Sequence, residues 1–166
     1  TFIIIVRINF DYNFIHIKKM ENEKHERDLT NVFVGVISEA ILEKEYAWYS
    51  DEYNSYHVDS VLLTQLKSHI SEVSISIYMA TWCGDCHREI PRFYKILNQA
   101  NIDESRIVNA AMDIHKKTPE NYEEGMNIEK IPTFIFFKHG QELGRIIEKP
   151  KVSLEHDMLE ILKREV

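Results

Sequence analysis

The passage from "VSISIYMA" to "TWCGDCHREIP" limits the fold of this chain more than any other stretch. The first segment is rich in β-branched and aromatic residues, which predicts a buried strand over residues 73–80. The second segment holds Cys83 and Cys86, the only cysteines in the sequence. We expect a helix from Cys83 or Gly84 to about Ala100, so both cysteines lie where a strand ends and a helix begins. This junction is typical of an α/β fold.

The sequence after this helix continues the alternation of strands and helices. "RIVNAAMDI" predicts a second strand parallel to the first, and "TPENYEEG" predicts a helix over residues 118–125. "IPTFIFFKHGQELGRIIEK" predicts a β-hairpin with its turn at residues 139–140. A last helix follows, with Ser153 as its N-cap. This order of elements predicts one α/β domain over residues 73–166.

Residues 29–72 have a different pattern. Apolar residues at roughly helical spacing predict a helix over residues 29–46, capped by Thr30 or Asn31, and a second helix over residues 59–69. Between them, "AWYSDEYNSYHVD" has no helical or strand period and predicts a loop that packs through its aromatic side chains. We therefore expect a helical segment that packs on the α/β domain.

The sequence predicts that residues 1–28 form an N-terminal extension with poor order. The apolar run Phe2 to Val6 is interrupted by Arg7, and it is too short to span a bilayer and lacks the flanks of a signal peptide. Met20 precedes a polar stretch that reads as an ordinary protein start. The first nineteen residues are therefore expected to be poorly ordered or to be translated upstream sequence.

The composition narrows the function classes. The chain has 166 residues, 44% of them hydrophobic, which suits one packed domain. Its formal net charge of -7 and the absence of long basic runs argue against binding to nucleic acid. Two cysteines are too few for the disulfide framework of a small secreted domain, and their spacing indicates chemistry at the pair. We expect a cytoplasmic protein that binds no membrane.

Several motifs occur together in this sequence in a fixed order. They are the Trp82-Cys83-x-x-Cys86 run after a buried strand, Pro91 five residues beyond Cys86, Ile131-Pro132-Thr133 at the start of a strand, and Gly140 in a hairpin turn. With these motifs, the chain from about Ser74 onward resembles the thioredoxin superfamily. The helical segment before Ser74 makes it similar to bacterial thioredoxin-like proteins that have a CGDC centre.

The resemblance implies a thioredoxin fold, with a central mixed sheet flanked by helices and here an N-terminal helical extension. It also implies a thiol-disulfide oxidoreductase that needs no cofactor and no metal. Its expected partners are proteins that contain disulfides, and a reductase or dithiol donor that recycles it.

The chemistry of the cysteine pair follows from its place at a helix start. Unpaired N–H groups and the positive end of the helix dipole favour the thiolate of Cys83, which is therefore the expected nucleophile. Cys86, one turn later, is expected to resolve the mixed disulfide. The carboxylate of Asp85 raises the pKa of the Cys83 thiol, whereas a protonated His87 lowers it, and the sequence leaves the net sign open.

The resemblance assigns substrate binding to Trp82, Ile131 and Pro132. It implies that the Ile131–Pro132 bond is cis and lies against the cysteines, with the backbone of Ile131 open to an extended substrate. One feature of many thioredoxins is missing, because Ile77 stands where they bury an aspartate that deprotonates the resolving thiol. The carboxylates that could replace it if the fold brings one close, each expected to be solvated, are Glu89, Asp113, Glu123 and Glu124.

Three other interpretations of the cysteine pair remain open. "CGDCH" also fits the C-x-x-C-H pattern of covalent haem attachment, with His87 as the axial ligand. A zinc site could combine both cysteines with two histidines from among His87, His115 and His139. The chain could also be a redox-inactive interaction module on a thioredoxin fold.

Overall fold

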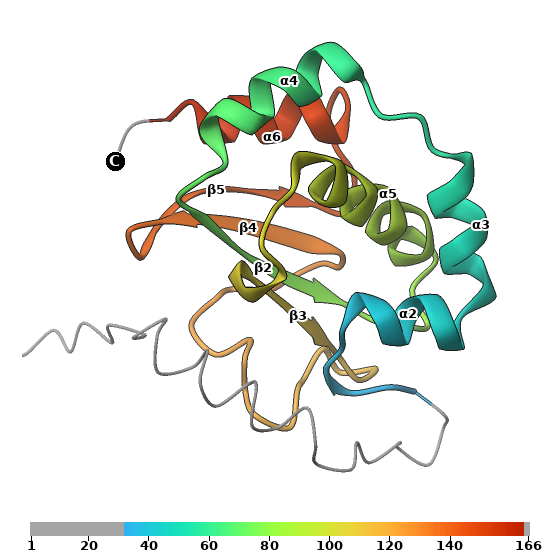
Figure 1. Cartoon of the computed structure of the whole chain (residues 1–166). Helices are drawn as coiled ribbons and strands as arrows, with labels where there is room; N and C mark the ends of the chain where they lie inside the picture. Colours follow the sequence, from blue (N-terminus) through green and yellow to red (C-terminus); the bar gives the residue numbers. More distant parts are fainter. Residues whose placement is uncertain (1–31, 165–166) are drawn as a thin grey trace, which may run out of the picture.

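The computed structural model describes residues 32–164, so the predicted extension over residues 1–28 lies outside the described part. The described residues form a five-stranded sheet in the order β1-β3-β2-β4-β5 (Figure 1). β2 and β3 are parallel, and the other neighbouring pairs are antiparallel. The sheet is therefore mixed, as predicted. Its strands are β1 (Gly35–Val36), β2 (Val73–Met79), β3 (Ile107–Ala111), β4 (Thr133–Lys138) and β5 (Gln141–Ile147).

Helices cover one face of this sheet, and the segment between β3 and β4 runs along the other (Figure 1). α4 and α6 pack on each other, and α3 lies along α5. Within the described part of the chain, no helix is long and apolar enough to cross a membrane. The helices are α2 (Glu39–Glu45), α3 (Ala47–Ser55), α4 (Ser60–His69), α5 (Gly84–Ala100) and α6 (Leu154–Leu162), with a 3₁₀ turn at Glu104–Arg106.

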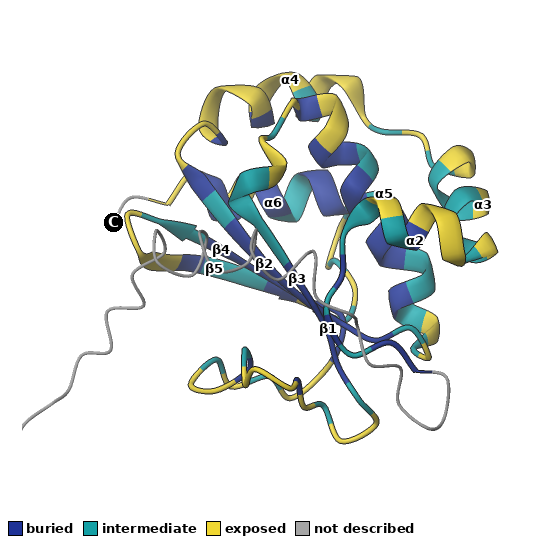
Figure 2. Cartoon of the chain, turned by 60° about the horizontal axis from the view of Figure 1, so that its bottom comes forward, coloured by how far each residue is buried: buried dark blue, intermediate teal, exposed yellow. Residues whose placement is uncertain are grey.

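The core lies between the sheet and α5. β2 is buried along almost its whole length, and the inner faces of the strands and helices are buried together (Figure 2). The Phe93 ring of α5 stacks on Phe134 of β4 at a centroid distance of 4.2 Å and meets Phe136 edge-on. Such aromatic pairs contribute about 0.5–1.5 kcal/mol beyond their burial. This packing holds the middle of α5 against β4.

The main predictions for residues 73–166 are confirmed. β2, the parallel strand β3, the long helix α5 with Pro91 inside it, and the β4–β5 hairpin all lie where the sequence predicts them. The Ser153 side chain caps α6 by accepting a hydrogen bond from the His156 backbone N–H. The second predicted helix of the N-terminal segment is also confirmed as α4, with Asp59 as its N-cap.

The predicted helix over residues 29–46 is wrong in its first half. Gly35 pairs with Ala111 in the antiparallel β1–β3 ladder, and its φ of 108° is incompatible with a right-handed helix. The helix begins only at Glu39, where the Ser38 side chain accepts a hydrogen bond from the Ile41 backbone N–H. The predicted caps Thr30 and Asn31 lie outside the described residues.

The predicted loop over "AWYSDEYNSYHVD" is also wrong, because its first part forms α3. Tertiary contacts to α5 stabilise this helix although its own periodicity is weak. The Lys95 ammonium donates to the backbone carbonyls of Tyr53 and Tyr56 at 2.7 Å, where the helix ends with unpaired acceptors. Tyr49 is buried against the domain, so the expected aromatic packing is confirmed.

The predicted helix over residues 118–125 is replaced by a series of turns. The Glu123 carboxylate accepts hydrogen bonds from both the backbone N–H and the hydroxyl of Thr118, and the Tyr122 backbone N–H donates to that hydroxyl. Such local side-chain bonds compete with helical hydrogen bonds. The Tyr78 hydroxyl of β2 donates to the Tyr122 carbonyl at 2.8 Å and so holds this segment on the sheet.

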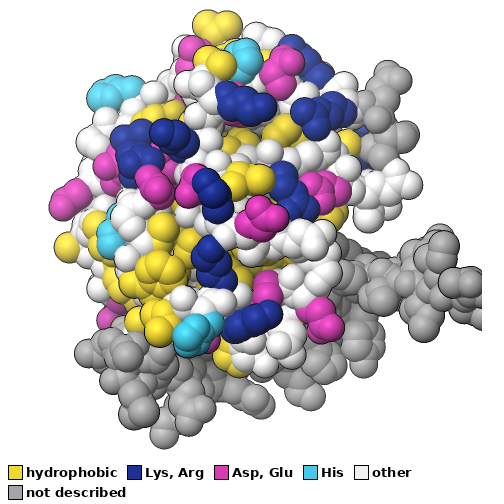
Figure 3. All heavy atoms as spheres, turned by 180° about the vertical axis from the view of Figure 1, so that it is seen from behind, with side chains coloured by type: hydrophobic (Ala, Val, Ile, Leu, Met, Phe, Trp, Pro, Cys, Tyr) yellow, Lys and Arg dark blue, Asp and Glu magenta, His cyan; other side chains and the backbone are white. Residues whose placement is uncertain are grey.

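Acidic and basic side chains are interspersed over the face seen in Figure 3. Mixed charges of this kind suit a solvated surface rather than a continuous basic track for phosphates.

Candidate active site

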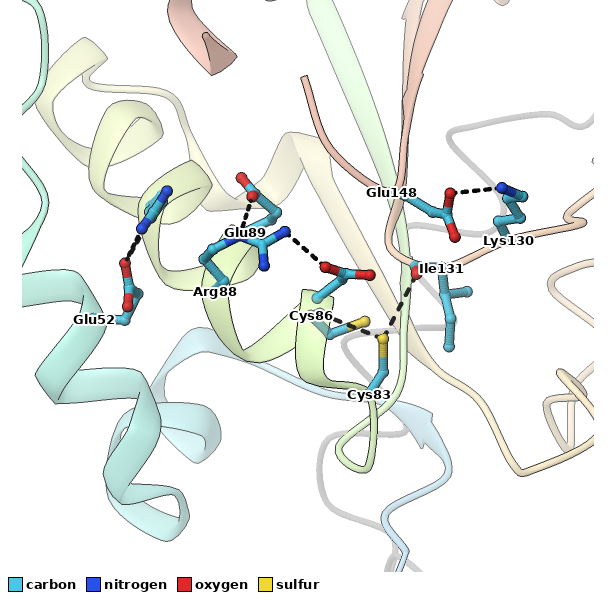
Figure 4. Close-up of polar contacts among 10 residues, drawn as sticks. Glu52, Cys83, Cys86, Arg88, Glu89, Lys130, Ile131 and Glu148 are labelled. Carbon is cyan, nitrogen blue, oxygen red and sulfur yellow. Dashed lines mark hydrogen bonds and ion pairs between the residues drawn. The ribbon is translucent and has the colours of Figure 1, made fainter. Parts of the chain in front are cut away.

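The two cysteines lie at the first turn of α5, directly beyond the end of β2. Cys83 is the N-cap residue of α5, and its sulfur accepts a hydrogen bond from the Cys86 backbone N–H at 3.4 Å. The two side chains point toward one another (Figure 4). Both cysteines are free thiols in this structure. The structure thus brings together the two sulfurs that the sequence singles out.

The two thiols have opposite environments. Cys83 is partly exposed, whereas Cys86 is fully buried. The hydrogen bond from the Cys86 thiol, assisted by backbone N–H groups of Cys86 and Asp85, lowers the pKa of Cys83 to about 6. Burial, followed by the hydrogen bond to Cys83, raises the pKa of the Cys86 thiol well above its ordinary value. Near neutral pH, the exposed sulfur is therefore mainly a thiolate and the buried sulfur is a thiol.

The Ile131–Pro132 peptide bond lies against Cys83, and it is cis, as the resemblance implies. In its thiol form, the Cys83 sulfur donates to the Ile131 carbonyl at 3.6 Å (Figure 4). The Pro132 carbonyl accepts a hydrogen bond from the Glu148 backbone N–H at 2.7 Å. The side chain of Ile131 is buried, so it is the backbone of this residue that faces the cysteines.

Trp82 lies at the surface immediately before Cys83. Its side chain is 41% exposed, and the indole N–H donates to the Met112 carbonyl at 3.3 Å. This hydrogen bond fixes the ring while leaving part of it open. Trp82 precedes Cys83 in the chain and the Ile131 carbonyl contacts the Cys83 sulfur, so the residues predicted to bind substrate lie next to Cys83.

Asp85 lies in the first turn of α5, and its charge raises the pKa of Cys83 against the larger lowering effects. The Asp85 carboxylate accepts a hydrogen bond from the Arg88 guanidinium at 2.7 Å. Arg88 also donates to Glu89 at 2.7 Å, so one guanidinium joins two carboxylates. The expected opposition of Asp85 to thiolate formation is therefore present, although a cation partly balances its charge.

His87 is enclosed by two contacts. Its ring stacks on Trp48 of α3 at a centroid distance of 4.4 Å, and its Nε2 lies 2.7 Å from the Thr81 carbonyl. A carbonyl oxygen only accepts, so Nε2 carries the proton and donates this bond. His87 thereby joins the loop before Cys83 to the helix after it. Its effect on the Cys83 thiol stays a prediction.

The position expected to lack a buried aspartate is occupied by the fully buried Ile77. Of the carboxylates that could replace the aspartate, Glu89 and Glu123 are buried, so the expectation that they are solvated is wrong. Glu123 is bound to Thr118 on the other face of the sheet, whereas Glu89 lies on α5 one turn after Cys86. Burial of Glu89 is balanced by Arg88, as a buried charge requires.

Three contributors to the site could not be found from the sequence pattern. Trp48 falls in the segment predicted to be a loop, and it reaches His87 from far away in the chain. Lys130 and Glu148 form an ion pair of 2.7 Å beside Ile131 (Figure 4). No local motif marks these residues, because their contacts depend on how α3 and β5 are placed against the cysteines.

The rival metal interpretations find little support in the geometry. Cys86 is 0% exposed, which leaves no approach for the vinyl group of a haem. The histidine of "CGDCH" has its Nε2 engaged with a backbone carbonyl. Over residues 32–164, no three histidine, cysteine or acidic side chains converge on a point that could hold a metal ion.

The fold and the cysteine geometry define a protein of the thioredoxin class. A family model described as Thioredoxin matches residues 38–160, so the chain belongs to this family. A crystal structure of a protein of unknown function from Pseudomonas aeruginosa superposes with a TM-score of 0.54 at 16% identity, over 77% of this chain and 90% of that one. This likeness concerns the fold alone.

Among curated relatives, the chain is 31% identical over 115 residues to the TPR repeat-containing thioredoxin TDX of Arabidopsis thaliana. That match covers 68% of this chain and only 29% of the plant protein. Identity to the putative thioredoxin-5 of Dictyostelium discoideum is 30% over 90 residues, which cover 54% of this chain and 82% of that protein. Identity to a thioredoxin of Mycobacterium bovis is 28%, over 63% of this chain and 85% of that protein. These relatives support redox function of the thioredoxin type.

Proposed function

We propose that this protein is a thiol-disulfide oxidoreductase that reduces disulfides in other proteins through Cys83 and Cys86. The observation that carries this proposal is the pairing of a partly exposed, low-pKa thiol at a helix start with a buried thiol one turn later. A nucleophile must reach its substrate, whereas a resolving thiol needs only to reach the nucleophile.

The reaction has two exchange steps. The Cys83 thiolate attacks one sulfur of the substrate disulfide, a mixed disulfide forms, and the other substrate sulfur leaves as a thiolate that takes up a proton. Cys86 then loses its proton and attacks the Cys83 sulfur, which closes the Cys83–Cys86 disulfide and releases the second substrate thiolate. Two electrons pass from the dithiol to the substrate, and a reductase or an external dithiol must return two electrons before the next cycle.

We propose that the protein acts as a reductant of disulfides rather than as an oxidant of thiols. The hydrogen bonds at the helix start stabilise the Cys83 thiolate, and Asp85, which lies between the cysteines, opposes it and so limits how far the reduced form is stabilised. Weaker stabilisation of the reduced form lowers the reduction potential, and 30 mV corresponds to about 1.4 kcal/mol for this two-electron couple. A reducing task also agrees with the cytoplasm as the proposed location.

A trapping experiment tests the proposed function. The Cys86→Ser variant should accumulate a mixed disulfide between Cys83 and a model protein disulfide such as insulin, because the resolving step is removed. The Cys83→Ser variant is the matched control and should form none. A Cys83→Ser variant that still reduces the substrate, or a Cys86→Ser variant that traps nothing, would contradict the proposal.

A further inference from the structure

The turn that leads to Cys83 is tied to the start of α5 by His87. The turn is hydrogen-bonded, because the Cys83 backbone N–H donates to the Ala80 carbonyl at 3.2 Å. The Thr81 carbonyl belongs to the central peptide of this turn, and it accepts a hydrogen bond from His87 Nε2 at 2.7 Å. The orientation of the central peptide is what distinguishes one turn type from another. The bond from His87 therefore fixes the course of the chain immediately before the exposed sulfur.

The orientation of the His87 ring is set by Trp48 of α3. The two rings stack at a centroid distance of 4.4 Å, with 19° between their planes. Trp48 also contacts the rings of Tyr46 and Tyr49, at centroid distances of 5.5 Å and 6.2 Å. Tyr49 is buried, so this group of rings is anchored in the body of the protein. Without the indole beside it, the imidazole could rotate to another side-chain rotamer and release the Thr81 carbonyl.

The position of the Cys83 sulfur matters because hydrogen bonds control its charge. The pKa of the Cys83 thiol is lowered chiefly by the hydrogen bond from the Cys86 thiol and further by the backbone N–H groups of Cys86 and Asp85, whereas burial and the Asp85 carboxylate raise it. Hydrogen bonds weaken steeply as their angle departs from linearity. A turn that loses its fixed geometry should therefore hold a smaller fraction of Cys83 as thiolate.

We infer that Trp48 is a positioning residue of the active site, which acts through His87 to hold the turn before Cys83 in the geometry that favours its thiolate. This inference rests on the proposed function, since it concerns the nucleophile of the exchange reaction. It gives the N-terminal helical segment a part in that reaction, because α3 supplies Trp48. His87 contributes as a hydrogen-bond donor, a role that a neutral side chain can also fill.

The rate at which iodoacetamide alkylates Cys83 tests this inference, because only the thiolate reacts. At a pH near the pKa of Cys83, His87→Leu removes the donor and should slow alkylation about fivefold. His87→Gln keeps a donor without a charge and should stay within about twofold of the wild-type rate. Trp48→Ala should slow alkylation about threefold, whereas Trp48→Phe keeps a stacking ring and should restore most of the rate.

A double variant shows whether Trp48 acts through His87. Trp48→Ala combined with His87→Leu should react no more slowly than His87→Leu alone, because residues that act through one another are not additive. The matched control is Tyr53→Ala, since Tyr53 is another aromatic residue of α3 but stacks on Tyr49, at 5.8 Å, rather than on His87. This control should keep the wild-type rate. Cys86 is fully buried, so its protection from iodoacetamide shows that each variant is folded during the measurement.

Four results would overturn the inference while leaving the proposed function standing. They are an unchanged rate in His87→Leu, equal slowing by His87→Gln and His87→Leu, additive slowing in the double variant, and a Tyr53→Ala rate as low as that of Trp48→Ala. Failure of the wild-type protein to reduce insulin would instead contradict the proposed function itself.

Discussion

The start of α5 has two flanks, and they differ in what surrounds them. On one flank, Trp48 of α3 stacks on His87, and His87 donates to the loop that leads to Cys83. On the other flank, Asp85 and Arg88 face Glu148 across an open, charged hollow. The first flank is closed by aromatic rings and holds the loop in place. The second is an open hollow, so the two flanks of one helix start differ in how tightly they are packed.

The largest expected difference is in the alkylation rates of the two cysteine thiols. Because the pKa of Cys83 is lowered to about 6 and Cys86 is buried with a raised pKa, iodoacetamide should modify Cys83 first at neutral pH. We expect a rate difference of at least about 100-fold between the two thiols. Mass spectrometry of peptides over a pH series should show the rate at Cys83 falling as the pH drops through about 6.

The same shift predicts how the stability of the reduced protein depends on pH. The pKa of Cys83 falls from the usual 9.0 to about 6 on folding, so between these values the unfolded state binds more protons than the folded state. Stability from this group should rise with pH across that window and be lost as the pH falls through the folded value. Urea unfolding of wild type and Cys83→Ser should differ in this way, and identical pH profiles would contradict the assigned pKa.

Removing the aromatic contact between Trp48 and His87 should destabilise the protein. Trp48→Ala deletes the ring that stacks on His87 and should lower the free energy of unfolding by roughly 2 kcal/mol, because the side chain is only partly buried. Trp48→Phe keeps a ring and should lose less than half of that. Urea denaturation measures both.

The smallest effect on stability is expected from relieving the backbone strain at Glu148. Glu148→Gly relieves the left-handed backbone at φ 61° and should raise stability by about 1 kcal/mol. Thermal unfolding should show a higher midpoint. A lower midpoint would mean that the Lys130–Glu148 pair outweighs the strain.

The two flanks also differ in how far the sequence predicts them. The strand, the cysteine pair and α5 follow each other directly, and their burial pattern is continuous, so local periodicity is enough to predict them. α3 is different, because its own period is weak and contacts such as those of Lys95 to its carboxyl end decide its fold. Tertiary packing of this kind overrides local propensity.

The site itself could be predicted only in part. Cys83, Cys86 and the Ile131–Pro132 bond belong to motifs with fixed spacing, and the structure brings them together. The enclosure of His87 and the burial of Glu89 depend on neighbours supplied by α3 and by Arg88, which no spacing rule indicates. The left-handed backbone at Glu148 is likewise not indicated by the sequence of β5.

Equilibration of the purified protein with glutathione buffers, followed by counting of free thiols, tests the central claim most directly. We predict a single two-electron transition in which Cys83 and Cys86 close one disulfide, with a midpoint near the value of about −270 mV that is typical of thioredoxin. Two thiols that stay free across the whole series, or a midpoint above about −180 mV, would contradict a reducing dithiol at the start of α5.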